Sequence, residues 1–210
     1  MTNKNKITPE ILKARKGIRE KIKMVTAYDS ITAKLLAAAA RIEVLWVSDL
    51  LGVTQLGYSG ALPVTLEEML HHTKAVSRSK VSALIVAQMP YLTYELNPTE
   101  AARNAGRLVK EGGADAVCVK GGVEILNSLG EITRTKIAVM GHLQIKKVDA
   151  KSKKIIKEIL EAAKVLENAG CFALLLENLP SQWASLVTKS LNIPTIGFRS
   201  GSRCDGEVLI

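Results

Sequence analysis

The feature that most constrains the fold of this chain is a regular alternation of short aliphatic runs and helical stretches. Runs with the composition of buried strands lie at 23–28, 44–48, 83–87, 116–119, 137–140, 172–176 and 194–197, and a further run begins at 208–210. Helical patterns lie at 31–41, 65–79, 97–112, 123–129, 152–168 and 181–191. Strands that alternate with helices in this way are typical of parallel βα units.

Capping residues mark where several of these helices begin. Thr65-x-x-Glu68 has the pattern of a capping box. Asn97-Pro98 combines a capping side chain with proline at the first helical position. Ser30 can cap the helix that follows it, and for Asp29 a capping role is as consistent with the sequence as a functional one.

Two architectures fit the alternation, an open doubly wound sheet and a closed (β/α)8 barrel. No GxGxxG motif follows the first strand, which disfavours the dinucleotide-binding form of the open sheet. Eight strands favour the TIM-type barrel. Only 4% of the residues are aromatic, so aliphatic side chains must form the core, as they do in parallel sheets.

The length of 210 residues and the lack of a linker predict a single barrel domain over 1–210. Within it, 1–20 is expected to be a helical, basic N-terminal segment. We expect the eighth strand to be incomplete and the last helix to be absent, which would leave a strand edge open.

Charge and cysteine spacing argue against a nucleic-acid-binding protein and against a protein with disulfides or a cysteine metal site. The formal net charge is +9, but Lys and Arg are mostly dispersed and no aromatic residues alternate with them, so nucleic-acid binding is not expected. Cys118, Cys171 and Cys204 form no metal-binding or CxxC spacing, which favours reduced thiols in a cytosolic protein. No apolar run of about 18 residues predicts a membrane span.

Polar residues near the carboxyl ends of the expected strands are the candidates for function, because these ends form the active-site mouth of such a barrel. The set comprises Tyr28, Asp29, Ser48, Asp49, Gln88, Cys118, Lys120, His142, Glu177 and Arg199.

Each main candidate also has a structural interpretation. His142 is as consistent with a structural histidine as with a functional one. Asp49 opens a glycine-containing loop, so a capping role is less natural there. Glu177 ends a buried aliphatic run, and partial burial would raise its pKa toward that of a useful base. Cys118 is expected to be an inert core thiol.

Several short motifs give these candidates a family context. The chain resembles ketopantoate hydroxymethyltransferases over about 20–210, and archaeal members in its HHTKAV and IPTIG segments. The motifs, in the order found in that family, are Thr26-Ala27-Tyr28-Asp29, Val47-x-Asp49-x-Leu51-Gly52, Leu62-Pro63-Val64-Thr65, His71-His72-Thr73-Lys74-Ala75-Val76, Gly141-His142-Leu143, Leu176-Glu177, Ile193-Pro194-Thr195-Ile196-Gly197 and Asp205-Gly206-x-Val208-Leu209.

The resemblance implies a barrel of the phosphoenolpyruvate/pyruvate superfamily in a cytoplasmic homo-oligomer. The implied reaction belongs to pantothenate biosynthesis and transfers a hydroxymethyl group from 5,10-methylenetetrahydrofolate to 3-methyl-2-oxobutanoate. In the family, Mg²⁺ chelates the α-keto acid and stabilises its enolate, while a glutamate removes the proton.

Carried over residue by residue, the resemblance makes Glu177 the base, Asp49 a metal-binding and substrate-binding aspartate, and His142 the active-site histidine. Leu50 stands where the family has serine, and its backbone N–H could bind a substrate carboxylate. Gln88 stands where the family has its second metal-binding aspartate, and a neutral amide is a poorer Mg²⁺ ligand than a carboxylate.

Further departures concern the residues around the metal. Cys118 replaces a substrate-binding lysine, and Lys120 replaces a carboxylate near the metal. Gln144-Ile145-Lys146-Lys147 stands in place of a longer glycine-rich loop.

Two hypotheses from different classes follow. The first is a hydroxymethyltransferase, in which Lys120 could supply positive charge in place of the metal. The second is a pseudoenzyme that keeps the fold and binds a keto acid or an intact homologue without turnover.

Overall fold

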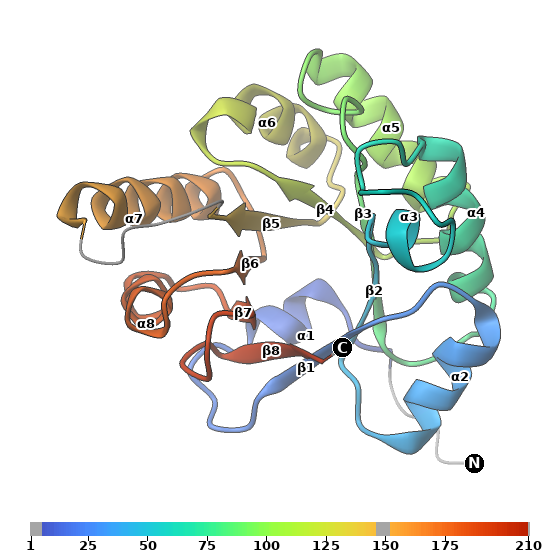
Figure 1. The fold of residues 1–210 in the computed structure, drawn as a ribbon, viewed down its shortest axis with the longest axis horizontal. Coiled ribbons are helices and arrows are strands. Elements are labelled where there is room, and N and C mark those ends of the chain that lie inside the picture. Colours follow the sequence, from blue (N-terminus) through green and yellow to red (C-terminus); the bar gives the residue numbers. More distant parts are fainter. Residues whose placement is uncertain (1–5, 146–151, 210) are drawn as a thin grey trace.

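Eight parallel strands form a closed barrel in which each strand pairs with its neighbours in sequence (Figure 1). The computed structural model describes residues 6–145 and 152–209. The strands are β1 (Ile22–Thr26), β2 (Val44–Val47), β3 (Leu84–Gln88), β4 (Ala116–Lys120), β5 (Val139–Gln144), β6 (Ala173–Glu177), β7 (Thr195–Phe198) and β8 (Gly206–Leu209). The predicted (β/α)8 architecture is therefore confirmed.

Helices surround the barrel and connect most of the strands (Figure 1). They are α1 (Pro9–Lys13), α2 (Ser30–Ala39), α3 (Leu51–Thr54), α4 (Leu66–Ser77), α5 (Pro98–Lys110), the 3-10 turn η1 (Val123–Ile125), α6 (Leu126–Arg134), α7 (Lys153–Asn168) and α8 (Ser181–Ser190). Of the described helices, none is long and apolar enough to cross a membrane.

The predicted helix starts are confirmed at two positions and differ at a third. Thr65 and Glu68 form the capping box of α4, and Asn97 caps α5. Asp29, rather than Ser30, caps α2, since its carboxylate accepts the backbone N–H groups of Ile31 and Thr32 at 2.8 Å each. The short helix α3 lies in a segment that was expected to begin a loop.

The expectation of an open strand edge is wrong, because β8 closes the ring. It begins at Gly206, two residues earlier than predicted, and pairs with both β1 and β7. A side chain at Gly206 would place its Cβ 2.6 Å from the carbonyl oxygen of Ile22. Only glycine permits β8 to approach β1 this closely. No helix follows β8 within the described residues.

Apolar side chains from the strands and from α1 pack together inside the barrel. Successive residues of a strand point to opposite faces, so alternate residues such as Trp46, Val86 and Met140 form one buried cluster inside the ring. Leu12 of α1 joins this cluster and is fully buried. A second cluster fills the space between the strands and the helices.

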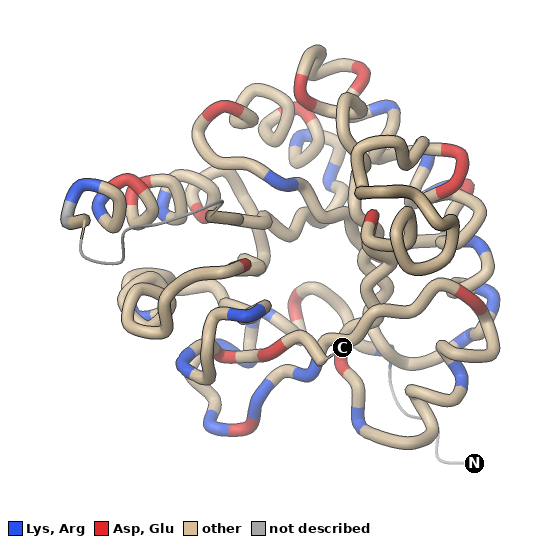
Figure 2. Tube along the Cα trace, in the orientation of Figure 1, with Lys and Arg blue, Asp and Glu red and all other residues tan. Residues whose placement is uncertain are grey.

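Lys and Arg occur on most of the helices and loops around the barrel, in line with their dispersion along the sequence (Figure 2). Lys146 and Lys147, which stand in the replaced loop, lie outside the described residues.

Candidate active site at the barrel mouth

Polar side chains occupy the inward-facing rows of the barrel at its carboxyl end. Gln88, Lys120 and Glu177 are the last residues of β3, β4 and β6. Each stands two residues after an apolar residue of the interior cluster and so faces the same side of its strand. These apolar residues are Val86, Cys118 and Leu175. The alternation of a strand therefore brings side chains from separate parts of the sequence into one site.

His142 and Glu177 form a buried pair on neighbouring strands. His142 lies inside β5 rather than after its end, because β5 runs on to Gln144. Its Nε2 is 2.8 Å from Glu177 Oε2. Trp46 packs edge-on against the imidazole, with the ring centroids 6.0 Å apart. The exposed fractions of His142 and Glu177 are 2% and 9%, so water does not compete freely for their contact.

The environment fixes the protonation of this pair. Burial lowers the pKa of His142, which favours the neutral imidazole. Its Nδ1 is buried without a hydrogen-bond partner, whereas Nε2 faces Glu177. A neutral ring that carries its proton on Nε2 can donate to an ionised Glu177, and this tautomer satisfies the pair best.

The expectation of a raised pKa at Glu177 is wrong. Burial acts in that direction, but the hydrogen bond from His142, the positive charge of Lys120 and a hydrogen bond from Gln144 outweigh it and lower the pKa. Lys120 Nζ lies 3.6 Å from Glu177 Oε2. The site carboxylate with a raised pKa is Asp49, where burial outweighs the positive charge of Lys120.

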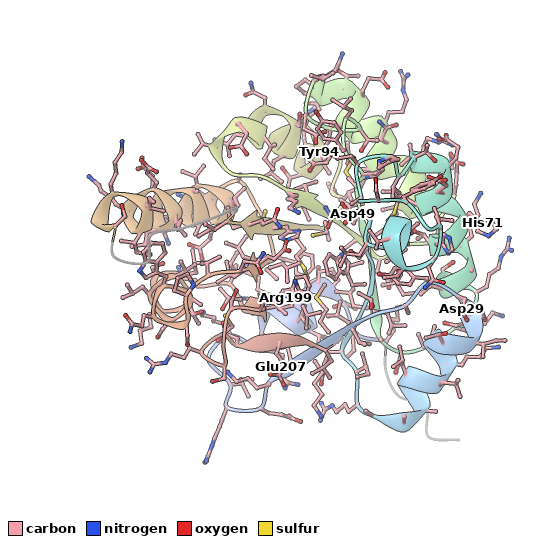
Figure 3. All side chains as sticks on the ribbon, viewed as in Figure 1. Asp29, Asp49, His71, Tyr94, Arg199 and Glu207 are labelled. Atoms are coloured by element: carbon pink, nitrogen blue, oxygen red, sulfur yellow. The ribbon has the colours of Figure 1, made fainter. Side chains whose placement is uncertain are left out.

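Asp49 follows β2 and lies toward the centre of the ring, whereas Asp29 lies at its outer edge (Figure 3). The Ser48 hydroxyl donates to Asp49 Oδ1 at 3.3 Å. The backbone N–H of Leu50, which the sequence offers for a substrate carboxylate, donates to Ser48 Oγ at 3.2 Å. Ser48 therefore links two of the proposed substrate-binding residues, Asp49 and Leu50.

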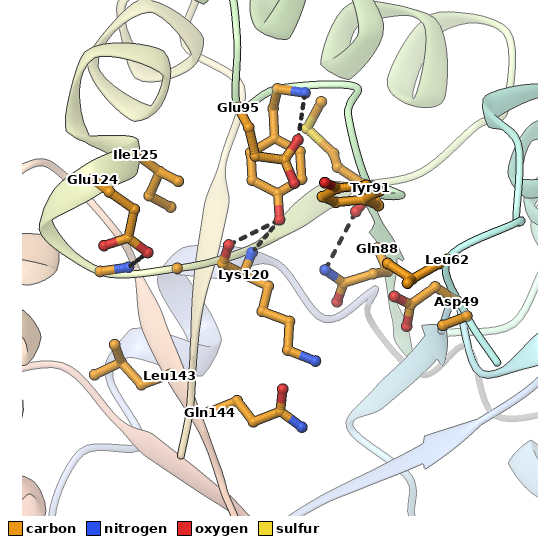
Figure 4. Close-up of a pocket in the computed structure, with 15 residues that line it drawn as sticks. Asp49, Leu62, Gln88, Tyr91, Glu95, Lys120, Glu124, Ile125, Leu143 and Gln144 are labelled. Carbon is orange, nitrogen blue, oxygen red and sulfur yellow. Dashed lines mark hydrogen bonds between the residues drawn. The ribbon is translucent and has the colours of Figure 1, made fainter. Parts of the chain in front are cut away.

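A cavity of about 650 Å³ opens beside these groups. Asp49, Gln88 and Lys120 line it together with Leu62, Tyr91 and Gln144. Figure 4 shows the Lys120 side chain pointing into this space. The volume is sufficient for a small keto acid and part of a second, larger molecule.

Tyr94 is a site residue that the sequence did not reveal. Its hydroxyl donates to the Lys120 carbonyl at 2.8 Å and accepts the Lys120 N–H at 3.1 Å (Figure 4). Burial raises the pKa of Tyr94, which keeps the hydroxyl protonated and able to donate. Tyr94 lies in the loop between β3 and α5, where neither strand nor helix periodicity indicates which side chains turn inward.

Other candidates lie outside the site or are inert. Asp29 caps α2. Arg199 is exposed, and its guanidinium lies 5.2 Å from the centre of the Phe198 ring. Cys118 faces the barrel interior, where burial raises the pKa of its thiol well above the ordinary value. The structure thus brings together Asp49, Gln88, Lys120, His142 and Glu177 from the predicted set.

The residues present do not fit the Mg²⁺ ion that the resemblance implies. Asp49 lines the cavity beside the neutral Gln88, and the other lining carboxylates, Glu95 and Glu124, each accept a backbone N–H, from Tyr94 and Gly122 respectively. The Lys120 ammonium lines the same cavity and would repel a divalent cation. The described residues contain no group of three or more His, Cys, Asp or Glu side chains that could hold a metal ion.

Comparison with known proteins identifies the family of this chain. The family model described as ketopantoate hydroxymethyltransferase matches residues 6–210. The chain belongs to the ketopantoate hydroxymethyltransferase family. The 3-methyl-2-oxobutanoate hydroxymethyltransferases of Carboxydothermus hydrogenoformans and Syntrophus aciditrophicus are 44% and 43% identical to it. Each alignment covers 98% of this chain, and 78% and 79% of the respective relative.

Solved structures show the same barrel at low sequence identity. Phosphoenolpyruvate phosphomutase from Streptomyces platensis superposes with a TM-score of 0.73 at 16% identity, over 96% of this chain and 79% of that protein. A 2,3-dimethylmalate lyase of the PEP mutase/isocitrate lyase superfamily gives 0.70 at 15% identity, over 90% and 70% of the two chains. At these identities the similarity establishes the fold that this ketopantoate hydroxymethyltransferase family member shares with them.

Proposed function

We propose that this protein transfers a hydroxymethyl group to 3-methyl-2-oxobutanoate, the reaction for which its relatives are named. 5,10-methylenetetrahydrofolate is the donor that the family resemblance implies. The observation that carries the proposal is the buried His142–Glu177 pair, which Lys120 connects to the cavity that Lys120 and Asp49 line.

In this proposal Glu177 is the base. The lowered pKa of Glu177 keeps it ionised at neutral pH. His142 occupies its Oε2 atom, and Oε1 has a long contact of 3.5 Å with Asn178 Nδ2. Oε1 is therefore the atom that accepts the proton from C3 of the keto acid, while His142 holds the carboxylate in place.

Loss of the C3 proton leaves its bonding electrons in an enolate. Water adds to the methylene carbon of the folate and both of that carbon's bonds to folate nitrogen break, which gives formaldehyde and leaves the two protons of water on the two nitrogens. The enolate carbon then bonds to the formaldehyde carbon, and the proton held by Glu177 passes to the oxygen, which becomes the hydroxyl group. Asp49, Gln88 and His142 are the proposed substrate contacts, together with the backbone at Leu50, whose N–H would exchange Ser48 Oγ for the substrate.

A second function has a specific observation in its favour. The described residues hold no acidic cluster for a metal, and Gln88 stands at the position where the family resemblance places an aspartate. A protein that keeps the barrel and binds a keto acid or an intact homologue, without turnover, would tolerate this change.

Product formation separates the two functions. The full chain is incubated with 3-methyl-2-oxobutanoate and 5,10-methylenetetrahydrofolate labelled with ¹³C at the methylene carbon, and products are followed by NMR. Transfer of the label into a new hydroxymethyl group supports the enzyme. Keto acid binding without labelled product supports the pseudoenzyme, and the variant Glu177→Gln gives the background rate.

A further inference from the structure

The Lys120 ammonium lines the cavity, and the proposed reaction assigns it no role. Lys120 Nζ lies 3.6 Å from Glu177 Oε2, and its side chain is 34% exposed. Its positive charge also acts on Asp49. Burial raises the pKa of Asp49, and the charge of Lys120 is the largest effect that lowers it. The ammonium thus lies within electrostatic reach of both site carboxylates.

The backbone of Lys120 is held more firmly than that of an ordinary surface lysine. Tyr94 is 4% exposed, and its hydroxyl bonds both the N–H and the carbonyl of Lys120. On the other side, Lys120 pairs with His142 in the β4–β5 register. The stem of the side chain therefore starts from a fixed point and leads into the cavity (Figure 4).

The neighbouring side chains favour an anion beside this ammonium. An ammonium has three N–H donors, and its ion pair with Glu177 Oε2 at 3.6 Å is longer than a hydrogen bond, so donors remain for a ligand. Gln88 is 1% exposed and its Oε1 has no hydrogen-bond partner. At this position the amide contributes no negative charge that would neutralise the lysine or attract a divalent cation.

We propose that the Lys120 ammonium binds the carboxylate and carbonyl oxygens of a 2-oxo acid in this cavity, and that this binding needs no divalent metal ion. The inference rests on the proposed function, because it takes a keto acid as the ligand. An ammonium placed in advance beside the carbonyl oxygen stabilises the negative charge of an enolate as well as that of the bound acid. Tyr94 is a positioning residue that acts through Lys120.

Calorimetric titration of the full chain with 3-methyl-2-oxobutanoate tests this, once in EDTA and once in excess Mg²⁺. We expect equal affinity in the two conditions. Lys120→Gln should weaken binding at least about tenfold, as expected for loss of a charge-assisted hydrogen bond. Lys34→Gln is the matched control, since Lys34 is exposed on α2, and it should bind as the unchanged protein does.

Metal binding gives a second, reciprocal test. Titration with Mg²⁺ alone should give no heat for the unchanged protein. The double variant Gln88→Asp/Lys120→Glu, which restores two carboxylates around Asp49, should gain Mg²⁺ binding. Tight Mg²⁺ binding by the unchanged protein would overturn the inference.

The outcomes distinguish this inference from the proposed function. Keto acid binding that appears only with Mg²⁺, or that Lys120→Gln leaves unchanged in EDTA, overturns the role of Lys120 and leaves the hydroxymethyltransferase standing. Metal-independent binding that depends on Lys120, without label transfer, supports the inference and rejects turnover. No binding in either condition contradicts both.

Discussion

His142 Nε2 and Glu177 Oε2 lie 2.8 Å apart in the interior of the barrel, although 35 residues separate them in the sequence. The pairing of β5 with β6 brings them together, and burial holds the imidazole neutral. The contact lowers the pKa of the carboxylate that we propose as the base. The pKa of Glu177 therefore depends on His142 of the adjacent strand.

Removal of this hydrogen bond should change the pH dependence of catalysis. His142→Phe keeps a ring of similar size but has no donor, so the Glu177 pKa should rise. A base is active when ionised, so the acid limb of the rate profile should move to higher pH. His142→Gln keeps an N–H donor and should shift the limb less. An identical acid limb in all three proteins would separate His142 from the ionisation of Glu177.

Asp205 should stabilise the fold in a pH-dependent manner. Its carboxylate accepts the Thr195 and Gly17 N–H groups and pairs with Lys16 at 2.9 Å. Burial alone would raise the Asp205 pKa, but these partners lower it overall. The stability that it contributes is present above the pKa of an unfolded aspartate and is lost as the pH falls through the folded value.

Asp205→Asn should therefore cost about 1–3 kcal/mol of unfolding free energy at neutral pH. The difference from the unchanged protein should shrink under acid conditions below the folded pKa. Urea unfolding at several pH values measures it. A difference that does not vary with pH would show that the charge of Asp205 contributes nothing.

Gly206→Ala tests the closure of the barrel at β8. The added Cβ would meet the Ile22 carbonyl oxygen at 2.6 Å, and the cost of such overpacking is about 1–3 kcal/mol. Gly130→Ala is the matched control, because a Cβ there has no neighbour within 4 Å and Gly130 lies inside α6. It should stabilise the protein by about 0.5–1 kcal/mol. Thermal unfolding of both variants compares the two, and equal melting temperatures would contradict the close approach of β8 to β1.

The thiols should be unreactive while the protein is folded. Cys118, Cys171 and Cys204 are all buried and free, and burial raises the pKa of each. Iodoacetamide should label none of them at neutral pH and all three after denaturation, as mass spectrometry would show. Rapid labelling of Cys118 in the folded protein would mean that the barrel interior opens to solvent.

The barrel could be predicted from the sequence because each strand and each helix has its own local pattern of aliphatic and polar residues, and the alternation of these patterns indicates the fold. The sequence was less reliable where polar residues continue a strand. His142 and Gln144 lie within β5, but their polarity suggested that the strand had already ended. The start of β8 at Gly206 likewise depends on contacts with Ile22, which no local pattern reveals.

The sequence indicated which residues lie in the candidate site better than it indicated their pKa shifts. Strand-end positions identified Asp49, Gln88, Lys120 and Glu177 as neighbours. The direction of the Glu177 pKa shift could not be predicted, since it depends on the charge of Lys120 on β4 and on the hydrogen bond from His142 on β5. Tyr94 escaped prediction because its role rests on hydrogen bonds to a backbone distant in sequence.

The central claim is that Glu177 removes a proton from the keto acid. The most direct measurement is proton–deuterium exchange at C3 of 3-methyl-2-oxobutanoate, followed by NMR with the full chain in the presence and absence of Mg²⁺. This reaction isolates enolisation and needs no folate. We predict exchange that Glu177→Gln abolishes while the fold is retained. Exchange at the same rate in Glu177→Gln, or none from the folded, unchanged protein, would contradict the assignment.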